Sequence, residues 1–367
     1  MPRWSVAIAA SSADARDALA SSALRKLCPA QSMTPVAARR PLLPVQDQTM
    51  ARSPAILQKP LQKQPAAAVS PAAAVSTPPM QEKPRAAFLT PSRYEPYAGD
   101  AYEHVDVIGR GAFGLVTKMR CRADGGLVAM KTVDRSRLHT AYLQKTAHRE
   151  ARTLRRLGAH PHIVALREVI ECDRSIHIVL ELVDGCTVAE LCGRAADGRL
   201  STADAATIAA QALDALAHCH AHRVCHRDVK ADNLLVDPAR LDGSVKLIDF
   251  GIAAVWREDG APLTRADGAT AYMAPERVAR RPYQGAPVDA WALGVVVATM
   301  LTGALPFQGA SEAELRDNIL GGRRNLGPPG LLSPSCLNFL GKLLAPEPSE
   351  RVSAAAAAGH PWLQYPS

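Results

Sequence analysis

Three side chains that could together transfer a phosphoryl group lie close in the sequence. Asp228 is followed two residues later by Lys230 and five residues later by Asn233. Transfer from a nucleotide to a hydroxyl needs an acceptor for the hydroxyl proton, a cation near the transferred group and an oxygen ligand for a metal. A second candidate metal ligand, Asp249, follows Asn233 by sixteen residues and begins the triplet 249–251. Either half alone could be chance, but the two in this order indicate phosphoryl transfer.

Residues 226–233 and 249–251 resemble the catalytic loop and the magnesium-binding triplet of the eukaryotic protein kinases. The resemblance implies that Asp228 is the catalytic base and that Lys230 neutralises charge on the γ-phosphoryl group of ATP. It also implies that Asn233 and Asp249 bind Mg²⁺. A lysine at position 230 resembles serine/threonine kinases and not tyrosine kinases. His226 is interpreted as a structural residue that packs beneath Phe250 of the triplet.

A glycine-rich segment precedes this pair of motifs. Its G-x-G-x-x-G-x-V pattern lets backbone N–H groups approach phosphate oxygens without clashes from Cβ atoms. The alternative is a dinucleotide-binding turn, which requires a helix directly after the glycines, whereas a second β-rich run follows here. We therefore expect a hairpin over ATP, formed by Ile108, Gly109, Arg110, Gly111, Ala112, Phe113, Gly114, Leu115 and Val116.

Residues 128–131 resemble the kinase strand that carries the phosphate-binding lysine. The resemblance implies that Lys131 holds the α- and β-phosphates and that Ala129 contacts the adenine. It makes Glu150 the ion-pair partner of Lys131, in the arrangement that active kinases adopt. The alternative is that Glu150 belongs to a solvated helix face, since it lies among many basic residues.

Residues 178–183 resemble the end of the strand that leads into the kinase hinge. Leu180 is then the gatekeeper, and backbone groups of Glu181 and Val183 bind the adenine. Leu235, two residues after Asn233, is expected to contact the nucleotide as well.

Two further motifs extend the resemblance over residues 102–363. Residues 268–276 resemble the end of the activation segment, in which Glu276 would pair with Arg351. Residues 288–295 resemble the helix that anchors the catalytic loop, with Asp289 capping the backbone of that loop. Both roles are structural.

The chain departs from the kinase pattern at two positions of the activation segment. Ala269 stands where most serine/threonine kinases have a threonine whose hydroxyl bridges the base and the loop lysine. Either Thr270 takes that role or one orienting hydrogen bond is missing. Arg265 stands at the usual activation phosphosite, which makes the neighbouring Thr264 the candidate phosphosite, with an unphosphorylated, competent segment as the alternative.

The predicted fold class is α+β, the two-lobed protein kinase fold. It comprises a small β-rich lobe with one main helix at 102–181, a hinge at 181–184 and a larger helical lobe at 185–363. Residues 1–98 are rich in Pro, Ala and Ser and are predicted to be a disordered extension. The resemblance places the close of the fold near residue 362, so no carboxy-terminal regulatory domain is expected.

Local patterns predict where the main elements lie. Strands are expected at 105–108, 115–119, 127–133, 163–166 and 176–182. Helices are expected at 141–157, ended by Gly158, and at 203–220. The apolar run 290–301 is too short to span a bilayer and is expected to be a buried helix.

Composition narrows the class of protein. The chain of 367 residues has a net charge of +8, of which residues 1–95 carry +7. This is a weak indication of an anionic partner, and a solvated basic tail is the alternative. The eight cysteines show no metal-ligand spacing and are expected to be reduced thiols of an intracellular protein.

The resulting prediction is an ATP- and Mg²⁺-dependent serine/threonine kinase, most similar to the calcium/calmodulin-regulated and metabolic-stress kinases. A pseudokinase scaffold and a nucleic-acid-binding protein are the rivals. The expected partners are protein substrates and an upstream kinase, and neither a membrane nor a nucleic acid is expected as a partner. The protein is predicted to be a monomer in the cytoplasm, with access to the nucleus as a further prediction. Basic substrates are only weakly indicated, since Thr187 and Thr299 occupy positions acidic in basophilic relatives. The arginines at 149, 152, 155 and 156 are interpreted as a solvated face rather than a docking site.

Overall fold

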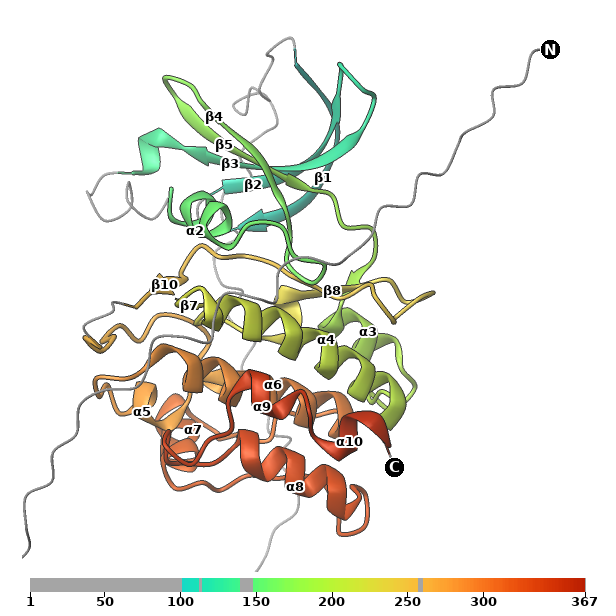
Figure 1. Ribbon diagram of the computed structural model, residues 1–367, viewed down its shortest axis with the longest axis vertical. Helices are drawn as coiled ribbons and strands as arrows, with labels where there is room; N and C mark the ends of the chain where they lie inside the picture. The colour runs from blue at the N-terminus through green and yellow to red at the C-terminus, as the bar shows by residue number, and fades with distance from the viewer. Residues whose placement is uncertain (1–100, 112–113, 139–147, 257–259, 367) are drawn as a thin grey trace, which may run out of the picture. The chain divides into compact units, whose positions relative to one another are not determined.

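The computed structural model describes residues 101–111, 114–138, 148–256 and 260–366. Within these ranges an antiparallel β-sheet is followed by a mainly helical region (Figure 1). This is the predicted order, and the fold class is confirmed. The predicted disordered extension at 1–98 lies outside the described residues, and the limits of the lobes and hinge stay predictions.

The sheet has five strands in the order β1-β2-β3-β5-β4. Because strands alternate their faces, Ala129 and Lys131 of β3 share one face, opposite Leu180 and Val116 respectively. This face carries the residues expected to meet the nucleotide. The strands are β1 (Tyr102–Gly111), β2 (Gly114–Cys121), β3 (Leu127–Asp134), β4 (Leu166–Glu171) and β5 (Ser175–Glu181).

The prediction of a strand over 163–166 is wrong, because β4 begins only at Leu166. Ile163 instead forms an isolated parallel bridge with Leu247, and the N–H of Val164 donates to the Leu247 carbonyl at 3.1 Å. Both Ile163 and Val164 are buried, so this apolar segment packs into the core beneath the sheet rather than extending it.

Helix α2 (Arg149–Leu157) is the one described helix that lies between strands of the sheet in sequence. Gly158 ends it as predicted, with φ of 68° and its N–H bonded to the Leu154 carbonyl. The first part of the predicted helix, 141–147, lies outside the described residues. A short 3-10 turn, η2 (Arg135–Arg137), follows β3.

The helical region is built around α4 (Thr202–Ala221) and α6 (Gly285–Thr302), which pack against each other. Helix α4 confirms the prediction at 203–220 and begins where the Ser201 side chain accepts from the Asp204 N–H. The other helices are α3 (Val188–Arg194), α5 (Pro275–Val278), α7 (Glu312–Leu320), α8 (Pro334–Leu343), α9 (Ala354–Ala357) and α10 (Pro361–Gln364).

Short elements fill the region between the sheet and the helices. They are β6 (Cys186–Thr187), β7 (Val224–Cys225), η3 (Ala231–Asn233), β8 (Leu234–Val236), β9 (Lys246–Leu247), β10 (Ala254–Val255) and η4 (Thr270–Tyr272). β6, β8 and β9 form one small sheet, and β7 pairs with β10. These pairings hold the catalytic-loop segment between fixed strands.

Helix α6 is long and apolar enough, by length and composition, to cross a membrane, but 78% of its apolar window is buried inside the domain. It is therefore the core helix that the run 290–301 predicted, although it is longer than that run. Trp291 of α6 is fully buried and stacks on Phe307 with ring centroids 5.3 Å apart. The seven described cysteines are free thiols.

Candidate active site

The catalytic-loop segment is fixed from below by Asp289 of α6. This buried carboxylate accepts the backbone N–H groups of His226 and Arg227, each at 2.8 Å, and lies 3.0 Å from His220 Nε2. Burial acts to raise the pKa of Asp289, but the hydrogen bond and charge of His220 outweigh it and the pKa is lowered. The predicted capping of the loop by Asp289 is confirmed.

Asp228 contacts both of the groups that the sequence placed near it. Its Oδ2 lies 2.9 Å from Lys230 Nζ and accepts from Asn233 Nδ2 at 3.0 Å. Asn233 Nδ2 also donates to the Asp228 carbonyl at 2.8 Å, which ties the loop to η3. The carboxylate, ammonium and carboxamide therefore converge as the spacing predicted.

Lys131 joins the sheet to the opposite side of the site. Its ammonium contacts Glu150 Oε2 of α2 at 2.7 Å and Asp249 Oδ1 at 3.0 Å. Burial acts to lower the pKa of Lys131, but the two carboxylates outweigh it and the pKa lies above its ordinary value. Glu150 is only 3% exposed, so the alternative of a solvated helix face is wrong for this residue.

Asp249 is the second residue expected to bind metal, with Asn233. Burial acts to raise its pKa, but Lys131 outweighs this effect and the pKa is lowered, so the group is anionic at neutral pH. Its φ of 63° is rare for a residue other than glycine and is typical of functional turns. Asn233 donates through Nδ2, so its Oδ1 is the atom with which it would bind a cation. A carboxylate and an amide oxygen are ligands that suit Mg²⁺.

His226 of the catalytic loop holds the triplet 249–251 in place. The His226 ring packs edge-on against Phe250, with centroids 4.7 Å apart, and its Nε2 lies 3.0 Å from the Ile248 carbonyl. The structural interpretation of His226 is confirmed. Gly251, which completes the triplet, donates its N–H to Asp249 Oδ1 at 3.3 Å.

The glycine-rich segment forms the end of the β1–β2 hairpin. Gly111 pairs with Gly114, Arg110 with Leu115 and Gly109 with Val116. A strand follows the glycines, so the alternative of a dinucleotide-binding turn is wrong. A Cβ at Gly114 would lie 1.6 Å from the Thr132 carbonyl oxygen, so only glycine fits there. The predicted nucleotide contacts Ala112 and Phe113 lie outside the described residues.

The remaining predicted nucleotide contacts are exposed or half-buried in the structure. Ile108 is 47% exposed on β1, as expected of a residue that would cover a ligand. Val116, Val183 and Leu235 are half-buried, whereas Leu234, next to Leu235, is fully buried in the core. The adenine contacts themselves stay predictions.

An ion pair between Glu181 and Lys246, which we call the Glu181–Lys246 clamp, was not predicted. Glu181 ends β5, and its carboxylate contacts Lys246 Nζ of β9 at 2.9 Å and accepts the Ala165 N–H at 3.1 Å. The only sequence signal was an acidic hinge residue and a lysine three positions before Asp249, which does not reveal a contact across 65 residues.

Contacts of Thr270 and Ala269 decide between the two alternatives for the missing threonine of the activation segment. Thr270 Oγ1 donates to Glu312 of α7 at 2.9 Å, so the first alternative, that Thr270 takes the orienting role, is wrong. The backbone N–H of Ala269 lies 3.4 Å from Asp228 Oδ1 in its place. The hydroxyl is therefore missing, because Ala269 stands at that position and the hydroxyl of the next residue, Thr270, is bonded to α7.

Glu276 of α5 pairs with Arg351 through two contacts of 2.8 and 3.1 Å, which confirms the predicted pair. Arg277, which was not predicted, donates to the Arg227 carbonyl at 2.8 Å and to the Asp267 carbonyl. It thereby joins the activation segment to the catalytic loop. Thr264 lies exposed in this segment.

Comparison with known proteins decides the family. Residues 102–363 match the protein kinase domain. The chain belongs to the protein kinase family. A kinase domain implies the use of ATP, so the residues above surround a nucleotide site.

The kinase relatives are of the serine/threonine type. The chain is 38% identical over 275 residues to CBL-interacting protein kinase 4 of Oryza sativa subsp. japonica, which covers 74% of this chain and 59% of that protein. It is 33% identical to serine/threonine-protein kinase SIK2 of Gallus gallus, over 72% of this chain and 32% of the relative. It is 34% identical to probable serine/threonine-protein kinase MARK-A of Dictyostelium discoideum, over 71% of this chain and 24% of the relative. The chain thus spans less than two thirds of the length of each of these relatives.

Proposed function

We propose that this protein is an active, ATP- and Mg²⁺-dependent serine/threonine kinase that phosphorylates protein substrates. One observation carries the proposal. Lys131, Glu150 and Asp249 are already joined by contacts of 2.7 and 3.0 Å, while Asp228 is joined to Lys230 at 2.9 Å. These pairs are the arrangement from which kinases transfer a phosphoryl group.

Each residue has a separate task in this proposal. Asp228 orients the substrate hydroxyl and accepts its proton. Lys230, 2.9 Å from that carboxylate, offsets negative charge on the transferred group. Lys131 holds the α- and β-phosphates, and Glu150 keeps its ammonium in place. Asn233 and Asp249 would hold Mg²⁺, which neutralises phosphate charge when bound.

Thr264 stays the predicted phosphosite for an upstream kinase. The rice relative is named for CBL interaction, but the match spans 59% of it, so no such partner enters the proposal. The cytoplasmic location and the monomeric state stay predictions.

The test compares the wild-type chain with Asp228→Asn. Both are incubated with labelled ATP, Mg²⁺ and a generic protein substrate, and phosphoserine, phosphothreonine and phosphotyrosine are separated in the product. We expect transfer to serine and threonine by the wild type and a loss of several orders of magnitude in the variant. ATP binding without transfer above the variant would instead identify a pseudokinase scaffold.

A further inference from the structure

One buried arginine, Arg277 of α5, reaches from the activation segment to the catalytic loop. It is only 4% exposed. Its Nη1 donates to the Arg227 carbonyl at 2.8 Å, and its Nη2 donates to the Asp267 carbonyl. Among the described residues no carboxylate pairs with this guanidinium group. Burying a charge without an ionic partner is costly, so Arg277 needs an explanation other than charge pairing.

The backbone from which Arg277 extends is anchored. The preceding residue, Glu276, pairs with the fully buried side chain of Arg351 at 2.8 Å, and Arg351 also donates to the Pro287 carbonyl at 2.8 Å. The Arg277 guanidinium group lies over the ring of Tyr283, 5.6 Å from its centroid. The planar donor fork is therefore held at both ends of the side chain, which suits it to fix two acceptors at once.

The two acceptors lie beside one contact of the catalytic base. Arg227 directly precedes Asp228, and Asp267 stands two residues before Ala269. The backbone N–H of Ala269 lies 3.4 Å from Asp228 Oδ1. Because peptide groups are planar, a fixed carbonyl also fixes the start of the next residue. One guanidinium group thus holds the chain next to both partners of this contact.

Gly268 brings the activation segment directly onto the base. Its φ is 116°, a value that favours glycine, and a Cβ at this position would lie 3.2 Å from both the Arg227 carbonyl oxygen and Asp228 Oδ1. No side chain of Gly268 separates the two segments. A small displacement of the activation segment therefore changes the surroundings of the carboxylate at once.

The two oxygens of Asp228 are held by different parts of the chain. Lys230 and Asn233, both within the catalytic-loop segment, contact Oδ2 at 2.9 and 3.0 Å. Among the described residues only the N–H of Ala269 donates to Oδ1. The orientation of Oδ1 thus depends on the position of the activation segment, which Arg277 ties to the catalytic loop.

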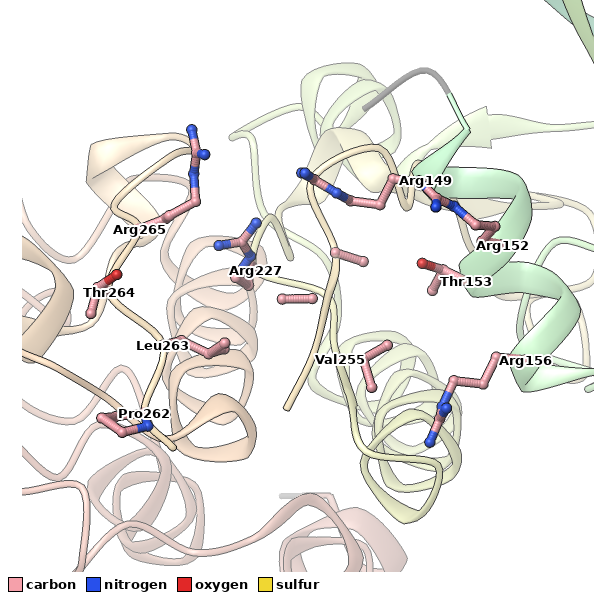
Figure 2. Close-up of a pocket in the computed structure, with 12 residues that line it drawn as sticks. Arg149, Arg152, Thr153, Arg156, Arg227, Val255, Pro262, Leu263, Thr264 and Arg265 are labelled. Atoms are coloured by element: carbon pink, nitrogen blue, oxygen red, sulfur yellow. The ribbon is translucent and has the colours of Figure 1, made fainter. Parts of the chain in front are cut away.

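The side chain of Arg227 has a separate place in the structure. It lines a cavity of about 570 Å³ between α2 and the activation segment, where Figure 2 shows it with Leu263 and Thr264. Its Nε donates to the Ile252 carbonyl at 2.7 Å. The link from Arg277 uses the backbone carbonyl of Arg227, so it does not depend on that side chain.

We propose that Arg277 is a positioning residue that holds the Ala269 N–H at Asp228 Oδ1, where the threonine hydroxyl is missing. Its guanidinium group contacts backbone carbonyls and not the carboxylate, so it acts on the reaction through Asp228. The effect on transfer rests on the proposed kinase function, whereas the effect on the activation segment does not.

The first measurement is hydrogen exchange, which does not depend on transfer. The full-length wild type is compared with Arg277→Met, which keeps a long apolar side chain, and with Arg281→Met, which changes an exposed arginine four residues later. We expect the backbone amides of 267–271 to exchange about ten-fold faster in Arg277→Met and at the wild-type rate in Arg281→Met. Equal exchange in all three chains would overturn the proposal.

Arg277→Lys provides a second variant of the buried residue. Lysine keeps the charge but replaces the donor fork by one ammonium group. We expect its exchange at 267–271 to lie between that of the wild type and that of Arg277→Met. Melting temperatures verify that each variant folds, and Arg277→Lys alone carries the comparison with Arg281→Met if Arg277→Met does not fold.

The second measurement is steady-state kinetics on one peptide substrate. We expect Arg277→Met to lower kcat by about ten-fold, because Asp228 is less well oriented. The KM for ATP should change by less than about two-fold, since Lys131 keeps its contacts with Glu150 and Asp249. Arg277→Lys should recover part of kcat. A higher KM for ATP with an unchanged kcat would overturn the proposal.

Ala269→Thr separates positioning from a general loss of stability. The added hydroxyl gives the activation segment a second contact with Asp228, so Arg277→Met should lower kcat less in the Ala269→Thr chain than in the wild type. The same fold-loss in both chains would assign Arg277 to stability alone and overturn the proposal. If the exchange rates differ as expected but the wild type transfers no phosphate, the kinase function fails and the positioning of the segment stands.

Discussion

Asp228 receives a backbone N–H where related kinases supply a hydroxyl. Ala269 N lies 3.4 Å from Asp228 Oδ1, which is at the long limit of a hydrogen bond, while Thr270 is engaged with Glu312. The base is therefore oriented mainly by Lys230 and Asn233. One orienting contact is weak, which affects the rate of transfer rather than its occurrence.

This contact gives a prediction for Ala269→Thr. A hydroxyl at position 269 adds a hydrogen bond near Asp228 of about 0.5–1.5 kcal/mol, so we expect kcat to rise roughly two- to ten-fold. The KM for ATP should stay the same because Ala269 lies at Asp228 Oδ1, whereas Lys230 and Asn233 contact Oδ2. Steady-state kinetics on one peptide substrate measure both values.

Thr270→Ala is the matched control for that substitution. It removes a hydroxyl bonded to the exposed Glu312 and should leave kcat nearly unchanged. A fall in kcat for Thr270→Ala, with no rise for Ala269→Thr, would show that Thr270 holds the orienting role after all.

Between elements, Asp289 is the main link from α6 to the catalytic loop. Its pKa is lowered from the ordinary value of 3.8, so the anion stabilises the fold above that value and this contribution is lost as the pH falls through the lower folded pKa. We expect the free energy of unfolding to decrease below about pH 4, and the decrease to be smaller in Asp289→Asn. Urea unfolding at a series of pH values between about pH 3 and pH 6 measures how the free energy of unfolding changes with pH.

Asp242→Asn provides the comparison, since Asp242 is exposed in a turn. Its pH dependence should match the wild type. An Asp289→Asn chain with the same slope as the wild type would mean that other carboxylates govern acid unfolding.

For the whole molecule, the described core closes within the kinase domain. Its largest cluster includes Ala129 of β3, Leu213 of α4 and Trp362 of α10, and it joins the sheet to the last helix. A domain with its own core is expected to fold alone. We therefore expect removal of residues 1–98 to change the melting temperature by less than about 3 °C and the transfer rate by less than about two-fold. Calorimetry and a peptide assay measure the two quantities, and loss of a cooperative transition would contradict this prediction.

The motifs predicted the site well because each is a local pattern with one structural solution. Asp228, Lys230 and Asn233 lie within one short loop, so their convergence follows from spacing alone. The Lys131–Glu150 pair spans 19 residues, but the resemblance supplied its geometry. The prediction of a strand at 163–166 was wrong because a short apolar run has the same pattern whether it extends a sheet or packs beneath it.

Other features could not be read from the sequence because they depend on three-dimensional packing. A cavity of about 570 Å³ brings side chains of α2 together with residues of the activation segment that lie more than 70 positions later. The side on which Thr270 lies depends on Glu312, a residue of a distant helix.

The Glu181–Lys246 ion pair links the predicted hinge to the segment that carries Asp249, the carboxylate proposed to bind Mg²⁺. Lys246 lies three residues before Asp249, so a ligand that pulls on the hinge strand loads the short segment that ends at that carboxylate. In the proposed kinase, adenine binding at the hinge and Mg²⁺ binding at Asp249 then share one short supporting segment. We expect a nucleoside without any phosphate to change the affinity for Mg²⁺.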